Sequence, residues 1–374
     1  MNKKPKAILW HVLRLAMMAA LVAYVVSQAE WDDTVRPDGL HVAGIKTIAL
    51  RLAARWWWVA AALGVMTLQS PIGAVRWRLL LGVQGIHITF LESLRLTYIG
   101  WFFNNWMPGA TGGDFVKAWY IARQTQRKPE AVTVVFLDRL IGMVSLAVLG
   151  AAAALATLSD ERVRSARIIL AVFLGLAAAG GWIFYSRRLR RLVRLDRLLA
   201  RLPVGHVVAR VDQALFIYRH HKGTVALSVV YSWAAQAVSV FATYFLATGL
   251  GSDARLHHFF INMPVVWIFW SLIPVPGGFG VAEGLAQQFF NGAVLGVPAA
   301  EAATLALAMI LAFRVVQSAV SLPGAALYLA RRTDVSPRMM RETMAAADPE
   351  GAEAPPFGDA ERNVPPGTGG PGDA

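Results

Sequence analysis

Two stretches rich in glycine and proline interrupt the apolar sequence of this 374-residue chain, and each carries a carboxylate near its end. The first, PGATGGD, covers residues 108–114 and ends in Asp114; the second, PVPGGFGVAEG, covers residues 274–284 and contains Glu283. Such carboxylates can bind a cation, accept a proton or pair with a buried base. Irregular backbone at membrane depth is tolerated only where it is buried in protein or lines a wet cavity. One broken segment in each half of the chain therefore predicts a transporter's substrate site.

Charged side chains inside apolar sequence are costly and are candidates for function. Asp114 and Lys117 lie three residues apart after the first break, and Asp138 is followed directly by Arg139 within a later apolar segment. Adjacent residues do not face each other on a helix, so Asp138 and Arg139 require different partners. Arg139 or Lys117 could neutralise a carboxylate of a broken segment. The structural alternatives are a helix cap at Asp114 and an ion pair between helices at Asp138 and Arg139.

Backbone amides and side-chain amides complete the candidate site. Glycines next to the breaks allow close backbone approach, and exposed amides at a helix N-terminus can meet an anion such as a lipid phosphate. Asn104 and Asn105 precede the first break, where they could bind freed backbone groups or a substrate. Arg314, on the last apolar segment, is a possible partner for Glu283. The predicted substrate-binding residues are Asn104, Asn105, Gly112, Gly113, Asp114, Lys117, Asp138, Arg139, Gly277, Gly278, Glu283 and Arg314.

Other chemistry finds little support in the sequence. The chain has no cysteine, which excludes disulfides, thiolate catalysis and cysteine metal sites. The pairs His220-His221 and His257-His258 have no Asp, Glu or Cys at metal-ligand spacing along the chain, so we interpret them as interfacial polar residues. Motifs for nucleotide binding, serine hydrolysis and zinc proteolysis are absent from the sequence. We therefore predict no catalytic residue, no metal and no cofactor.

Composition places the chain in a membrane. Hydrophobic residues make up 56% of it and charged residues 16%, which is far from a soluble average. The net charge is +13, and ten Lys or Arg against two Asp gather in residues 186–222. These cations flank apolar segments, so topology and anionic lipids explain them better than nucleic acid does. Residues 333–374 are rich in Ala, Pro, Gly and acidic residues, and we expect a disordered tail after a membrane domain of residues 1–332.

Charge counting predicts the arrangement in the membrane. Six full spans are expected at residues 8–26, 56–75, 131–158, 167–185, 224–250 and 299–329. With the basic linker 186–222, both termini and Arg76 in the cytoplasm, residues 88–121 must enter and leave on the cytoplasmic side. Residues 259–291 must likewise enter and leave on the outer side. We expect an all-α polytopic protein with two opposed re-entrant hairpins, as in an inverted repeat, although eight to ten full crossings give the same loop locations. Ser27-Gln28-Ala29 also fits a signal-peptidase site.

Three segments together resemble the lysylphosphatidylglycerol synthase transmembrane-region family, also called UPF0104 or flippase-like. They are FFNNWMPGATGGDFVKAWYIAR at residues 102–123, VVFLDRLIGMVSL at 134–146 and PVPGGFGVAEG at 274–284. The resemblance covers about residues 8–332 and implies a bacterial inner-membrane protein that moves lipids or lipid-linked molecules between leaflets. Residues at the matching motif positions are Asn105, Gly113, Asp114, Asp138, Arg139, Gly277, Gly278 and Glu283. The family often has Glu where this chain has Asp138.

The resemblance also bears on the alternatives. Full-length synthases of that name carry a large soluble domain after the membrane part, whereas a short low-complexity tail follows Arg332 here, so we do not expect aminoacyl transfer. Translocation of anionic or lipid-linked headgroups is the leading hypothesis, with membrane lipids as partners. An intramembrane transferase acting on lipid-linked substrates and a non-catalytic scaffold for lipid-synthesis enzymes stay open. The lipid, the energy source and the oligomeric state are not determined by the sequence.

Overall fold

The computed structural model describes residues 23, 27, 30–35, 41–106, 112–125, 128–185, 218, 220–273 and 279–330. All of the predicted first span except residue 23, nearly all of the basic linker, and the acidic tail lie outside these residues. In the described part, β1 (Thr34–Val35) and β2 (His41–Val42) form a single small antiparallel sheet, and the remaining elements are helices. The prediction of an all-α polytopic membrane protein is confirmed.

Five helical segments in the described part are long and apolar enough to cross a membrane. They match the five predicted spans that fall on described residues. A short helix, α2 (Ile45–Ala54), precedes them. The spans are built from α3 (Trp56–Thr67) with α4 (Gln69–Val83), α7 (Lys128–Leu155), η1 (Glu161–Val163) with α8 (Arg164–Tyr185), α12 (Lys222–Leu250), and α16 (Ala299–Ser321) with α17 (Pro323–Ala330).

The two predicted hairpins are pairs of packed helices. The first is α5 (Phe90–Trp106) with α6 (Gly112–Thr125), and the second is α13 (Leu256–Leu272) with α14 (Val281–Phe289). At a rise of about 1.5 Å per residue, α6 spans about 21 Å and α14 about 14 Å, less than the hydrocarbon core of about 30 Å. These lengths favour re-entrant hairpins over full crossings, and re-entrance stays a prediction.

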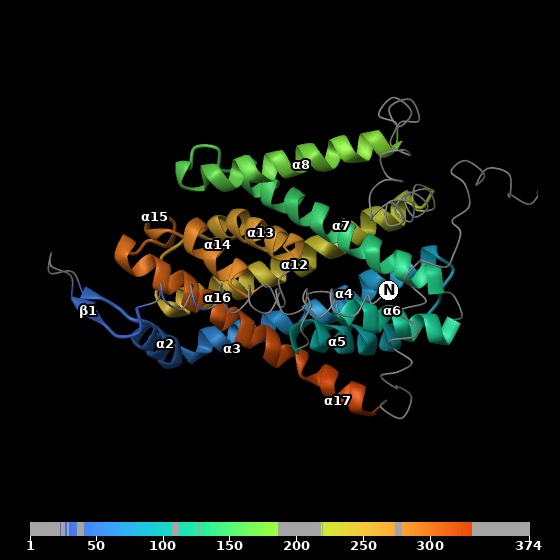
Figure 1. Ribbon diagram of the computed structural model, residues 1–374, viewed down its shortest axis with the longest axis horizontal. Helices are drawn as coiled ribbons and strands as arrows, with labels where there is room; N and C mark the ends of the chain where they lie inside the picture. Colours follow the sequence, from blue (N-terminus) through green and yellow to red (C-terminus); the bar gives the residue numbers. More distant parts are fainter. Residues whose placement is uncertain are drawn as a thin grey trace, which may run out of the picture.

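The hairpins enter the bundle from opposite ends (Figure 1). The long helix α7 begins beside the end of α6, at the base of the first hairpin. Its far end leads into η1, which packs against the start of α13 at the base of the second hairpin. A short helix, α15 (Gly292–Leu295), closes the second base. Because one span connects the two bases, the hairpin tips point toward each other in the middle of the bundle.

Each hairpin has its own apolar core. One core gathers buried residues of α4, α5, α6 and α7, and another gathers those of α12, α13, α14 and α16. Glycines allow the arms of the first hairpin to touch, because a Cβ on Gly113 would lie 1.8 Å from the carbonyl oxygen of Gly100. The glycine at this position is therefore a packing requirement of the hairpin.

Candidate substrate site between the hairpin tips

A cavity of about 260 Å³ lies where the two hairpin tips meet. Its walls come from both hairpins and from the spans α4, α7, α12 and α16, so residues far apart in the sequence share it. Its polar lining is formed by Gln69, Asn104, Asn105, Arg139, Gln236, Ser239, Ser271, Arg314 and Gln317, and its apolar lining by Leu146, Trp267, Trp270, Phe279 and Phe313. Amides and guanidinium groups in an apolar bundle can bind a polar guest that has left water.

The first hairpin tip is held by an amide side chain. Asn104, near the end of α5, accepts a hydrogen bond of 2.8 Å from the backbone N–H of Gly113, in the first turn of α6. The first turn of a helix has N–H groups with no intrahelical partner, and this contact satisfies one of them. Asn104 thus binds a freed backbone group, which is one of the two roles that the sequence allowed it. Both Asn104 and Asn105 also face the cavity.

Asp114 is the buried centre of the charges at this tip. Its carboxylate accepts a hydrogen bond of 2.8 Å from Nε of Arg139 on α7 and a second one from a terminal guanidinium nitrogen. The Lys117 ammonium lies 3.2 Å away, and it also sits 5.0 Å from the ring centre of Trp77. Asp114 lies in the first turn of α6, where a negative charge is favoured by the helix dipole. One carboxylate therefore faces two cations.

The second hairpin repeats this arrangement. Glu283 lies in the first turn of α14, where one carboxylate oxygen accepts the Gly280 N–H at 2.8 Å and the other accepts Nε of Arg314 at 2.6 Å. The Arg314 guanidinium carbon lies 4.4 Å from the ring centre of Trp270 and 4.1 Å from that of Phe279. Two aromatic rings and one carboxylate thus fix Arg314 at the cavity wall.

Asp138 turns away from this site. It pairs with Arg76 of α4 at 2.8 Å, and Arg76 also donates to the Ser232 hydroxyl at 2.9 Å. The sequence placed Arg76 at the cytoplasmic end of its span, but the helix continues to Val83, so Arg76 lies within the bundle. Asp138 and Arg139 do face different partners, and Arg139 is the member of that pair that lines the cavity.

The predicted residues therefore fall into three groups. The cavity is lined by Asn104, Asn105, Arg139 and Arg314. The residues that bind these lining residues or one another behind the wall are Asp114, Lys117, Gly113 and Glu283. Asp138 belongs to neither group. Gly112 begins α6. Gly277 and Gly278 lie outside the described residues.

The sequence analysis did not identify three glutamines of the site. Gln69, Gln236 and Gln317 line the cavity from three different spans. The Gln69 side chain accepts a 3.0 Å hydrogen bond from Ser239, and Gln236 donates to the Gly142 carbonyl at 2.8 Å. Their signal in the sequence is a neutral amide inside an apolar span, which is weaker than the signal of a charge.

The charges around the cavity favour an anion. Arg139 and Arg314 reach its surface, and the two carboxylates that balance them stand behind. Lys117 shares Asp114 with Arg139, so the described residues of these two clusters carry one more positive charge than negative. Guanidinium groups bind phosphate and carboxylate oxygens in a planar, two-pronged geometry. The arrangement can hold an anionic or phosphate-bearing group, with the amides binding its neutral oxygens.

Comparison with known proteins adds a family. Residues 12–324 match the family described as the lysylphosphatidylglycerol synthase TM region. A UPF0104 membrane protein from Pyrococcus horikoshii is similar to this chain: the two are 24% identical over 279 residues, which cover 66% of this chain and 81% of that protein. No solved structure matches the chain.

Proposed function

Because the chain belongs to the lysylphosphatidylglycerol synthase transmembrane-region family, and is an integral membrane protein, we propose that it carries lipid headgroups between the two leaflets. The substrate is an anionic lipid or a lipid-linked anionic group, and the membrane is a bacterial inner membrane with both termini in the cytoplasm. The protein moves its substrate without altering it covalently. The observation that carries this proposal is the polar cavity, whose two arginines stand beside the tips of opposed hairpins.

The size of the cavity restricts what enters it. About 260 Å³ is below the usual 300–1,000 Å³ of sites that enclose a whole small-molecule ligand. A headgroup fits that volume, while two acyl chains do not. We therefore expect the chains to stay in the bilayer while the headgroup crosses between the tips. Alternating contact with each side needs movement of one hairpin-bearing half against the other, as in transporters built from inverted repeats.

A dithionite assay on proteoliposomes tests the proposal. The vesicles contain the full chain and a trace of a phosphatidylglycerol that carries a fluorescent label on one acyl chain, close to the headgroup. Dithionite bleaches only the labels in the outer leaflet. We expect the protein to expose more of the labelled lipid than empty vesicles do. Arg139→Gln should slow that exposure at least tenfold, because it removes a guanidinium group from the cavity surface. The variant should still fold, because Asp114 keeps Lys117 as its partner.

The matched control is Arg95→Gln, the same change at an exposed position on the first arm of the same hairpin. It should leave the rate unchanged. Equal rates for wild type, Arg139→Gln and empty vesicles would refute the translocation proposal. A covalently altered lipid in the same vesicles would favour a transferase, and loss of cellular function only on deleting residues 186–217 or 333–374 would favour a scaffold.

A further inference from the structure

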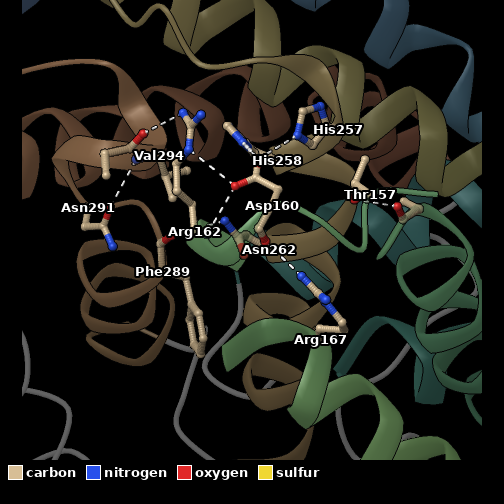
Figure 2. A network of polar contacts seen from close by, with 12 residues as sticks. Thr157, Asp160, Arg162, Arg167, His257, His258, Asn262, Phe289, Asn291 and Val294 are labelled. Carbon is tan, nitrogen blue, oxygen red and sulfur yellow. Dashed lines mark hydrogen bonds and ion pairs between the residues drawn. The ribbon is translucent and has the colours of Figure 1, made fainter. Parts of the chain in front are cut away.

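A second polar cluster lies at the base of the second hairpin, and none of its residues lines the cavity (Figure 2). Asp160 is the residue before η1, and its side chain accepts the Arg162 backbone N–H at 3.1 Å. His257 and His258 stand in the first turn of α13. Sequence spacing pointed to no acidic partner for these histidines, but the fold brings Asp160, between α7 and α8, to both of them.

The three side chains converge on one point. Nε2 of His257 lies 3.2 Å and Nε2 of His258 lies 2.9 Å from the same oxygen, Oδ2 of Asp160. The other oxygen, Oδ1, faces Arg162, whose Nε lies 3.3 Å away. Oδ2 is therefore the oxygen left for the histidines, and Figure 2 shows both rings directed toward it.

These separations suit a metal ion. Zinc bonds to histidine nitrogen and carboxylate oxygen are about 2.0–2.2 Å long, so two ligands of a tetrahedral ion stand about 3.3–3.5 Å apart. The observed separations of 3.2 and 2.9 Å fall a few tenths of an ångström below that range. The ring centres are 4.2 Å apart and steeply inclined, at 68°, so an ion can enter with small side-chain adjustments.

Burial is also compatible with an ion. The His258 side chain is 1% exposed and that of His257 26% exposed, so the site has one closed wall and one open position. The ligand atoms of Asp160, His257 and His258 all lie within 4.8 Å of one another, so one ion can contact all three.

We propose that Asp160, His257 and His258 form a binding site for a divalent transition-metal ion of the zinc class. Two imidazoles and one carboxylate are a ligand set that suits zinc, nickel and cobalt, and they exclude a preference for calcium or magnesium. Water completes the coordination on the open side. The bound ion ties the segment between α7 and α8 to the first turn of α13, and so fixes the base of the second hairpin. This inference is independent of the translocation proposal.

The test is metal binding by the full-length protein in detergent, purified with a tag that contains no histidine. Titration calorimetry with Zn²⁺ should give one site per chain, and Co²⁺ should produce the visible absorption bands of a four-coordinate site. Asp160→Asn keeps the side-chain oxygen that caps η1, and His257→Gln changes a partly exposed ring. Each should weaken Zn²⁺ binding at least tenfold and abolish the Co²⁺ bands.

The matched control is the double change His220→Gln with His221→Gln, at the other histidine pair of the chain. It should bind Zn²⁺ like wild type. Equal binding by wild type, Asp160→Asn and His257→Gln, or no binding by a wild-type protein that unfolds cooperatively, would overturn the proposal. A circular-dichroism melt of each variant shows whether it is folded. If Asp160→Asn does not fold, His257→Gln still tests the site.

Discussion

The ion pair between Glu283 and Arg314 provides the sharpest test of the site's architecture. The Glu283 side chain is 3% exposed and that of Arg314 13%, so the pair is largely removed from water. Breaking a buried pair by removing one member costs about 3–5 kcal/mol, because the other charge is left uncompensated. We expect Glu283→Gln and Arg314→Gln each to cost at least about 2 kcal/mol, somewhat below that range, since a glutamine still offers a hydrogen bond.

The double variant Glu283→Gln with Arg314→Gln should cost no more than the worse of the two single changes. With both charges gone, neither is left buried alone, and the introduced glutamine amide would still accept the Gly280 N–H. The expected coupling is therefore about 2 kcal/mol, in the range measured for residues in direct contact. Unfolding in mixed micelles of increasing SDS content, followed by tryptophan fluorescence, provides the four free energies.

A second pair in the same protein serves as the control. Lys46 of α2 pairs with Asp32 at the same 2.6 Å, but their side chains are 65% and 75% exposed. Exposed ion pairs are usually worth about 0–1 kcal/mol. The same cycle at Lys46 and Asp32 should therefore give a coupling below about 1 kcal/mol. Additive costs at Glu283 and Arg314, or equal couplings in the two cycles, would show that burial does not set the strength of these pairs.

Three further changes test other parts of the structure. Gly113→Ala should cost about 1–3 kcal/mol or more by forcing α5 and α6 apart, whereas Gly175→Ala, with open space around its Cβ, should be neutral or stabilising by up to about 1 kcal/mol in the same unfolding assay. Asp138→Ala should cost about 3–5 kcal/mol by leaving the Arg76 charge without its carboxylate in the bundle, and Arg76→Met in that background should recover most of it. The chain has no natural cysteine, so single cysteines can report on the hairpins. A cysteine at Trp106 should react with an impermeant thiol reagent only from the cytoplasm, and one at Phe279 only from outside. Reaction from the opposite side would mean a full crossing.

The sequence predicted the helical class and the location of the breaks because both depend on local patterns. Apolar runs of membrane length have few alternatives to helix, since every backbone group must find its partner within the segment. The rule that neighbours on a helix face different ways was enough to assign separate partners to Asp138 and Arg139. That the buried carboxylates have cationic partners was also predictable, because a carboxylate in such a segment must be compensated.

Partner choice across the bundle could not be obtained in the same way. The Arg76–Asp138 pair depends on how α4 crosses α7, and the Asp160–His258 contact joins residues 98 positions apart. Nothing in the local sequence fixes a crossing angle or the place where a loop folds back. The error at Arg76 has the same origin: a cation was taken as the end of a span, although a partner on another helix allows it inside. Neutral amides such as Gln236 carry an even weaker signal, because their burial requires only hydrogen bonds.

The two hairpins share one construction, and their difference leads to a last prediction. Each has a carboxylate in the first turn of its second arm, bound to an arginine on the next long span, 25 residues later in the first hairpin and 31 in the second. The first hairpin adds Lys117, so the described residues of its cluster carry a net positive charge, whereas those of the second cluster are neutral. Lys117→Gln removes that surplus and leaves the Asp114–Arg139 pair intact. We expect anionic headgroups to bind about tenfold more weakly, as the loss of a contribution of about 1.4 kcal/mol would cause, and zwitterionic ones unchanged, in tryptophan-fluorescence titrations with short-chain lipids. An equal loss for both lipid classes would mean that Lys117 only supports the fold, and the preference for anions would then need another source.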